Sequence, residues 1–245
     1  MSGPPDLVLA AFHWLEYLGL LGGIGSFVIR RLARIPPRIA WADPPMHIAF
    51  AAALGGGLGL LAFEHGSWVL PRVAAEGAAL VLCLRGKPYV APFAVLAAAL
   101  LPLAGHAAGV AQQAVGAQFA DALHVLSAGM WAGGILALAS LRPPEGWRSA
   151  DARALLERFG RVALLAFGIT ALTGLLRATE QLSEVSDLWA TTYGVVLLLK
   201  SAGVLAMLGT SLAWRRGLPA ARAEAAATIA VVGATALLAA FPLPA

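Results

Sequence analysis

Eight long apolar runs, separated by short loops rich in arginine, proline or acidic residues, constrain this chain more than any other feature of its sequence. They extend over about residues 7 to 29, 46 to 63, 69 to 84, 89 to 110, 118 to 141, 159 to 177, 188 to 213 and 225 to 242. Most approach the roughly 20 apolar residues that a helix needs to cross a bilayer. Only 12% of the residues are charged, about half of the ~25% usual in soluble domains. We therefore predict an all-α, polytopic bundle of about eight transmembrane helices, with residues 1–245 forming one integral membrane domain in the lipid bilayer.

The charged residues of the loops predict how the bundle is oriented. The formal net charge is +4, but the basic residues are spread among apolar runs, which does not indicate a nucleic-acid partner. They gather in alternate loops: Arg30, Arg31, Arg34 and Arg38; Arg85 and Lys87; Arg142, Arg148, Arg153, Arg158 and Arg161; and Arg215, Arg216 and Arg222. The other loops carry Glu64, Asp121, Glu180, Glu184 and Asp187, with Arg72 and Arg177 as their basic neighbours. Because lysine and arginine favour the cytoplasmic side, both termini are expected in the periplasm or outside the cell.

A shared pattern in the two halves of the chain suggests an internal repeat. His13 precedes Gly22-Gly23 by the same interval as His124 precedes Gly133-Gly134. Both histidines belong to helices that are expected to enter the membrane from the outside. This favours two four-helix units, residues 1–115 and 116–245, related by an axis along the membrane normal. The alternative is a coincidence between two glycine-rich helices.

Four of the five histidines are expected near the outer face of the membrane. Ionisable residues within membrane segments are rare and usually functional, and imidazole is a good ligand for copper, zinc, iron and nickel. Cys83 is the single cysteine, so a thiolate cage is excluded. We predict a metal site formed by His106 and His124 and completed by His13, Glu16 or His65. Glu16 follows His13 by three residues and Asp121 precedes His124 by three, so each carboxylate can share a helix face with its histidine.

An ion that crosses the bilayer needs polar groups below such a site. The candidates are Glu76, Thr170, Thr173, Tyr193 and Lys200, and Ser127 and Trp131 continue the helix face of His124. A lysine in the middle of a span repels a cation unless it is paired, for example with Glu76, or deprotonated. Lys200 is equally compatible with a structural ion pair or with a side chain that reaches the membrane surface.

Several short motifs give the second half of the chain a family resemblance. Gly105-His106-Ala107 closes one apolar run, and Ala122-Leu123-His124 leads to Trp131-Ala132-Gly133-Gly134 in the next. Arg158-Phe159-Gly160-Arg161, Thr173-Gly174, Thr192-Tyr193-Gly194 and Leu197-Leu198-Leu199-Lys200 follow in this order. From about residue 101 to residue 216 the chain resembles the CopD-type copper resistance membrane proteins. The resemblance implies an inner-membrane protein of about eight helices that handles copper at its periplasmic face through His106 and His124, alongside a small periplasmic copper-binding protein.

Three functions fit these observations. The first is copper uptake through an outward-facing histidine site, with copper delivered by a separate protein or as free ions. The second is electron transfer by a b-type haem held between His13 and His124, or between His106 and His124, since two facing histidines can ligate haem iron. The third is copper delivery to another protein without translocation. A hydrolytic enzyme is not expected, because the sequence has no Ser/His/Asp order, HExxH motif or phosphate-binding loop, and the pattern fixes no oligomeric state.

Overall fold

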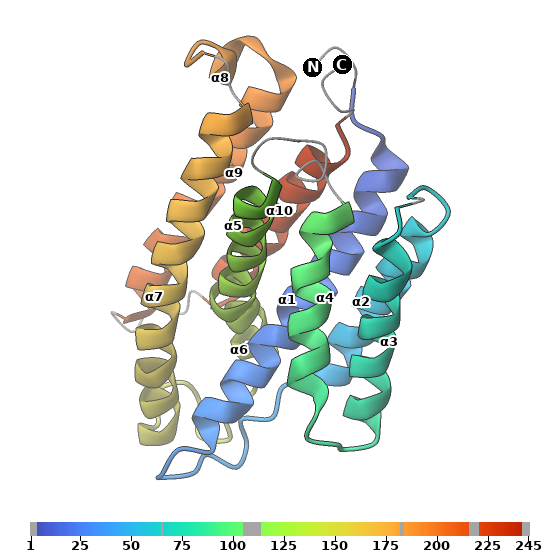
Figure 1. The fold of residues 1–245 in the computed structure, drawn as a ribbon. Coiled ribbons are helices and arrows are strands. Elements are labelled where there is room, and N and C mark those ends of the chain that lie inside the picture. The colour runs from blue at the N-terminus through green and yellow to red at the C-terminus, as the bar shows by residue number, and fades with distance from the viewer. Residues whose placement is uncertain (1–3, 65, 105–113, 182–183, 216–220, 242–245) are drawn as a thin grey trace.

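The chain folds into a bundle of long helices (Figure 1). The computed structural model describes residues 4–64, 66–104, 114–181, 184–215 and 221–241, and these ranges contain helices and no strands. The elements are α1 (Leu7–Ala33), α2 (Met46–Leu60), α3 (Val69–Leu84), α4 (Val90–Ala104), α5 (Ala114–Ala128), the π-helical segment η2 (Gly129–Gly133), α6 (Gly134–Ala139), α7 (Ala150–Gln181), α8 (Asp187–Ala190), α9 (Thr192–Arg215) and α10 (Ala221–Ala239). The predicted all-α membrane bundle is confirmed.

Each predicted apolar run overlaps at least one helix, and residues 105–110 of the fourth run lie outside the described residues. By length and composition, five of the described helical segments can cross a membrane: Leu7–Ala33, Val115–Ala139, Ala150–Leu176, Thr192–Ser211 and Ala221–Ala239. Met46–Leu60 and Val90–Leu103 are apolar but shorter. α3 contains Arg72 and Glu76, both buried. A fold with about eight transmembrane helices accommodates all of these segments.

Both ends of the described chain lie at one end of the bundle (Figure 1). There the backbone amide of Asp6 donates to the carbonyl of Ala240 over 3.1 Å. The Asp6 carboxylate also caps α1 by accepting from the amides of Val8 and Leu9. The loops that follow α1, α3 and α6, which are rich in basic residues, lie at the opposite end (Figure 1). We refer to the end with the termini as the outer end; the side of the membrane that it faces stays a prediction.

Glycines let α1 run through the centre of the bundle in close contact with its neighbours. Gly25 on α1 packs against the backbone of Gly133, and a Cβ atom added to Gly133 would overlap the carbonyl of Leu21. A Cβ atom on Gly19 would overlap the backbone of Ala53 on α2. Small residues allow this approach in lipid, where packing replaces the hydrophobic effect as the main attraction between helices. The two helices of the suggested repeat, α1 and α5–η2–α6, are thus in direct contact, although the repeat itself stays a prediction.

An apolar core fills the inner end of the bundle, and one arginine there connects α7 to the loop after α1. Ile29, Ile135, Leu138, Leu155 and Phe159 belong to this core. Arg158 donates hydrogen bonds to the carbonyls of Leu32, Ile35, Pro36 and Pro37, which end α1 and begin the following loop. The Arg158-Phe159 pair therefore ties α7 to the loop after α1 and fills the core beneath it.

Candidate functional site

A cluster of buried charges lies among α1, α3 and the loop between α2 and α3. We call it the arginine cluster, and it consists of His13, Glu16, Glu64, Arg72 and Glu76. The Arg72 guanidinium is 2.9 Å from a Glu16 oxygen and 3.0 Å from a Glu64 oxygen. His13 Nε2 is 3.2 Å from the other Glu64 oxygen, and His13 Nδ1 is 4.0 Å from Glu16. The predicted pairing of His13 and Glu16 on one helix face is therefore observed, but both side chains also belong to a larger network.

The carboxyl group of Glu76 completes this cluster on its inner side. Arg72 and Glu76 lie one turn apart on α3, and Glu76 interacts with both Glu16 and Arg72. Gly57 on α2 makes room for it, because a Cβ atom there would overlap a Glu76 carboxyl oxygen. Arg72 is 1% exposed, and Glu16 and Glu76 are fully buried.

Glu64 closes the cluster at its outer side and is the member that lies beyond the end of a membrane helix. Burial alone raises the pKa of its carboxyl group. The hydrogen bond to His13 and the positive charge of Arg72 act in the opposite direction and together bring the pKa below its ordinary value of 4.5. Glu64 is therefore a carboxylate at neutral pH and balances the charge of Arg72.

The position of Arg72 decides what the cluster can bind. Its guanidinium lies between Glu16 and Glu64, engages one carboxylate oxygen of each, and places a fixed positive charge where a metal cation would be repelled. Within the described ranges, no group of three or more His, Cys, Asp or Glu side chains is arranged to hold a metal ion. As observed, the cluster is a network of ion pairs that joins α1 to α3 and to the loop before it.

A second polar group lies on the other side of α1, between α5 and α7. His124 Nδ1 is 3.0 Å from the hydroxyl of Thr173. That hydroxyl donates to the carbonyl of Ile169 over 2.7 Å, so the Thr173 oxygen accepts the hydrogen bond of Nδ1–H. With Nδ1 as the donor, the lone pair of the neutral imidazole is on Nε2, the arrangement that suits a metal ligand with its other nitrogen held in place. A Cβ atom on Gly174 would lie 3.2 Å from Cε1 of His124, so the Thr173-Gly174 pair both bonds and accommodates the ring.

Polar and then aromatic contacts continue inward from His124 along the same two helices. One turn below, the hydroxyls of Ser127 and Thr170 are 2.7 Å apart. Another turn below, the rings of Trp131 and Phe167 meet edge to face, with their centroids 4.9 Å apart. Trp131 belongs to η2, and π-helical turns are frequent at functional sites. The predicted alignment of His124, Ser127 and Trp131 is therefore observed, and each of these residues has a partner on α7.

The remaining predicted residues are placed as follows. His65 and His106 lie outside the described residues. Lys200 on α9 interacts with the charge of Asp121 on α5. The predicted pairing of Lys200 with Glu76 is not observed among the described residues, where the contacts of Glu76 are with the arginine cluster. The ring of Tyr193 packs edge to face on Phe241.

Sequence reasoning missed the partners of the predicted residues. The charges of Glu64 and Arg72 predict the orientation of the bundle but not the ion pairs that the two residues form, and no sequence motif points to Phe167. One signal could have revealed the arginine cluster: Arg72 and Glu76 stand four residues apart in a segment that otherwise reads as a membrane helix. Two opposite charges at this spacing share a helix face, and their cost in lipid implies buried partners.

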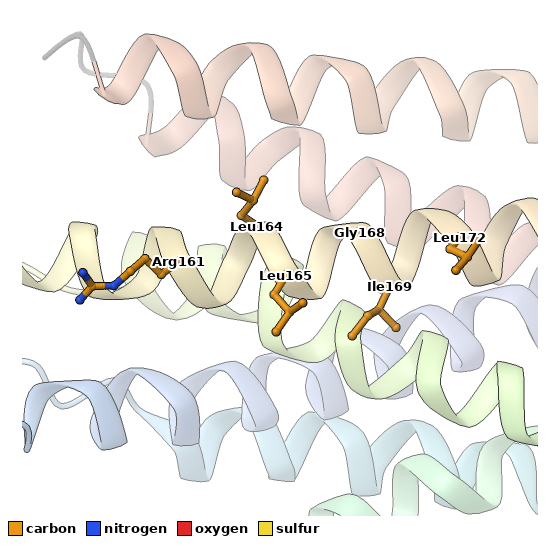
Figure 2. Close-up of a pocket in the computed structure, with 6 residues that line it drawn as sticks. All are labelled: Arg161, Leu164, Leu165, Gly168, Ile169 and Leu172. Atoms are coloured by element: carbon orange, nitrogen blue, oxygen red, sulfur yellow. The ribbon is translucent and has the colours of Figure 1, made fainter.

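A hollow of about 460 Å³ lies elsewhere, on the outward surface of α7. Figure 2 shows that its lining residues, Arg161, Leu164, Leu165, Gly168, Ile169 and Leu172, all lie along this one helix. Leu164, Leu165 and Leu172 are each more than 60% exposed. An apolar face of this kind suits contact with lipid chains and holds no metal ligand.

The fold and these sites define a polytopic helical membrane protein that buries polar groups between its helices. Residues 153–241 match the model of the family described as copper resistance protein D, CopD. This segment includes Phe167, Thr170 and Thr173, together with all of α9 and α10. The resemblance to the CopD family that the sequence motifs indicated from about residue 101 to residue 216 is confirmed where the two ranges overlap, at residues 153–216, and His106 and His124 precede the matched segment.

A named relative points the same way. The chain is 40% identical over 107 residues to the protein named copper transport protein CutJ of Bacillus subtilis (strain 168). The match covers 42% of this chain and 19% of that relative, so the chain spans about a fifth of the length of the relative it matches. No solved structure matches the chain.

Proposed function

We propose that this protein takes up copper across a cell membrane and that His124 is a ligand of its outer copper site. The observation that carries the proposal is the 3.0 Å contact between His124 Nδ1 and the Thr173 hydroxyl, which holds the ring through Nδ1. With Nδ1 as the donor, Nε2 is the nitrogen that binds copper. The match to the copper resistance family and the copper transport protein named among the relatives support copper as the metal.

Copper enters from the outer end of the bundle in this proposal. The loops rich in arginine lie at the opposite end (Figure 1), which by the positive-inside tendency is the cytoplasmic one. The protein is then an inner-membrane protein with both termini in the periplasm or outside the cell. A small periplasmic copper-binding protein supplies the metal, or copper arrives as free ions. The protein moves the ion and catalyses no chemical reaction.

His106 is the proposed second ligand. It follows α4, which ends at Ala104 at the same end of the bundle at which α5 begins (Figure 1). His13 and Glu16 are left out of the proposed ligand set, because both are engaged with the charges of Glu64 and Arg72. His65 follows Glu64 directly in the sequence and is left out with that cluster.

Metal analysis of the protein purified in mild detergent tests this site. Wild type should retain copper, and His124→Ala and His106→Ala should each lose most of it while staying folded. His47→Ala is the matched control: His47 is exposed near the start of α2, at the inner end of the bundle, and its loss should leave copper binding unchanged. Full retention of copper by both His124→Ala and His106→Ala would overturn the assignment.

An optical spectrum of the same sample tests the haem alternative. A haem protein shows a strong Soret band and contains iron, whereas the proposed copper protein shows no such band. If wild type shows a Soret band and His124→Ala does not, His124 ligates haem, and the function is electron transfer instead of copper uptake.

A further inference from the structure

The contacts between α5–η2 and α7 form three successive layers. The two helices run in opposite directions, so residue numbers increase along α5–η2 and decrease along α7 from one layer to the next. His124 meets Thr173, Ser127 meets Thr170, and Trp131 meets Phe167. Successive layers are three or four residues apart, which is about 5 Å along a helix. We call this line of contacts the α5–α7 seam.

We propose that the α5–α7 seam is the route by which copper moves inward from His124, and that the Trp131–Phe167 pair closes this route in the present structure. This inference rests on the proposed uptake function and adds the path and its gate.

The two threonine hydroxyls of the seam present oxygen lone pairs toward α5. The Thr173 hydroxyl donates a hydrogen bond to the carbonyl of Ile169, and the Thr170 hydroxyl donates one to the carbonyl of Ala166, each within α7. Their oxygens therefore act as acceptors across the seam, where they meet His124 and Ser127. An oxygen that already accepts from a side chain can accept a cation instead when the two helices separate slightly. The seam thus supplies an imidazole and then hydroxyl oxygens in sequence.

The aromatic layer ends this polar line. Trp131 is 4% exposed, and Phe159 packs over Gly134 one turn further in. Ile135, Leu138 and Leu155 fill the core below. The side chains of these three residues are pure hydrocarbon and offer a bare cation no ligand atom, so we place the start of the barrier at Trp131. The indole face is itself a favourable surface for a cation, which makes it a suitable last contact before the barrier.

The π-helical turn gives the aromatic layer a means to open. η2 spans Gly129–Gly133 and carries Trp131 between glycines. A π-helical turn holds one residue more than an α-helical turn, and such turns often mark functional sites. Its conversion to an α-helical turn would rotate Trp131 away from Phe167 without breaking the rest of the segment.

Cysteine accessibility tests the seam without copper. Cys83 is the single cysteine, so Cys83→Ser gives a background into which one cysteine at a time is placed. The probe is a membrane-impermeant, cationic thiol reagent applied at the outer side of the protein in liposomes. Ser127→Cys and Thr170→Cys should be modified measurably, and Leu138→Cys, below the aromatic layer, should not. With Trp131→Ala added, Leu138→Cys should become reactive; Phe167→Ala opens the same layer and replaces Trp131→Ala if that variant does not fold.

Two further cysteine variants provide the fast and slow reference rates of modification. Ser67→Cys lies in the exposed loop before α3 and should react fastest. Leu165→Cys lies on the outward face of α7, 69% exposed, and should stay inert because lipid covers it. Ser127→Cys and Thr170→Cys as inert as Leu165→Cys would show that the seam is a dry helix contact and would overturn the proposal. Reaction of Leu138→Cys with Trp131 intact would overturn the gate.

Measurements of copper flux into liposomes test the proposed route separately from the proposed uptake function. Thr170→Val removes one hydroxyl of the seam and keeps the side-chain shape, so it should retain bound copper but lower copper flux to the rate of protein-free liposomes. Thr210→Val on α9 is the matched control, since the Thr210 hydroxyl also donates to a carbonyl of its own helix and lies outside the seam. Wild-type flux in Thr170→Val overturns the route, whereas absence of flux in wild type overturns the uptake function and leaves the accessibility result to stand by itself.

Discussion

Arg72 is an arginine with 1% of its surface exposed in a helix that otherwise reads as a membrane segment. Burying a guanidinium costs far more than one ion pair returns, so such a residue is tolerated only when several acceptors surround it. Glu16 and Glu64 supply those acceptors from α1 and from the loop before α3. The cluster therefore acts as a single unit, and the loss of one member leaves the others with unpaired buried charge.

The first prediction concerns this unit. Arg72→Met should lower the free energy of unfolding by about 3–5 kcal/mol, the usual cost of removing one partner from a buried ion pair. Arg72→Lys keeps the positive charge but cannot contact Glu16 and Glu64 at the same time as a guanidinium does. Its free energy of unfolding should therefore lie between those of wild type and Arg72→Met. Denaturation in detergent, followed by circular dichroism, measures this. Arg85→Met, at an exposed position after α3, should behave as wild type, and an equal loss in both Met variants would contradict the account.

Glu64 gives the cluster a pH dependence with a definite sign. Its pKa is lowered in the folded state by His13 and Arg72, against the effect of burial. A carboxyl group with a lowered pKa contributes stability above its unfolded pKa, here 4.5, and loses that contribution as the pH falls through the lower folded value. The melting temperature of wild type should therefore exceed that of Glu64→Gln at neutral pH, and the difference should shrink in acid. A difference that grows in acid would show that the sign is wrong.

Thr173 positions His124, and its effect is on copper affinity. Thr173→Val removes the acceptor that holds Nδ1 and should weaken copper binding by about 10- to 100-fold, as the loss of such supporting hydrogen bonds commonly does. A competition titration with a copper chelator measures the affinity. Thr210→Val serves again as the control, and unchanged affinity in Thr173→Val would remove the reason for placing copper at His124.

At the scale of the elements, the boundaries of the helices could be predicted where composition changes sharply. The segment 69–84 was predicted with the observed bounds of α3, which Gly86 and Lys87 follow. The prediction failed most at α7, which begins at Ala150 instead of residue 159. Asp151, Arg153 and Glu157 are good surface residues for a helix outside the membrane, so the helix continues where the apolar run does not. Hydropathy detects the membrane part of a helix and cannot detect its extension into water.

Glycine contacts between helices make a further prediction at this scale. Gly133→Ala places a Cβ atom against the Leu21 carbonyl, a backbone group that cannot turn aside. It should destabilise the protein by about 1–3 kcal/mol or more, as overpacking usually does. Gly168→Ala is the matched control, because no atom lies within 4 Å of the added Cβ atom. Thermal unfolding of both variants checks the prediction, and equal melting temperatures would mean that α1 and η2 are not in close contact.

At the scale of the whole molecule, the sequence indicated the bundle and the common end of its termini more completely than the site. Apolar runs and loop charges depend on composition, which a single chain displays directly. The partners of His13 and His124 depend on which helices are neighbours: Glu64 and Arg72 lie 51 and 59 positions from His13, and Thr173 lies 49 positions from His124. Among the described residues, the predicted set of metal ligands is thus divided between two places, with His13 and Glu16 on one side of α1 and His124 on the other.

The central claim is that copper crosses the membrane by way of His124. The most direct test is copper flux into liposomes that contain wild type, His124→Ala or His47→Ala, reconstituted at equal density and supplied with copper at the outer end of the protein. The account predicts flux with wild type and His47→Ala, and flux no faster than that of protein-free liposomes with His124→Ala. Copper that binds wild type but never enters the liposomes would instead indicate a delivery protein, and equal flux with His124→Ala would show that copper does not pass this residue.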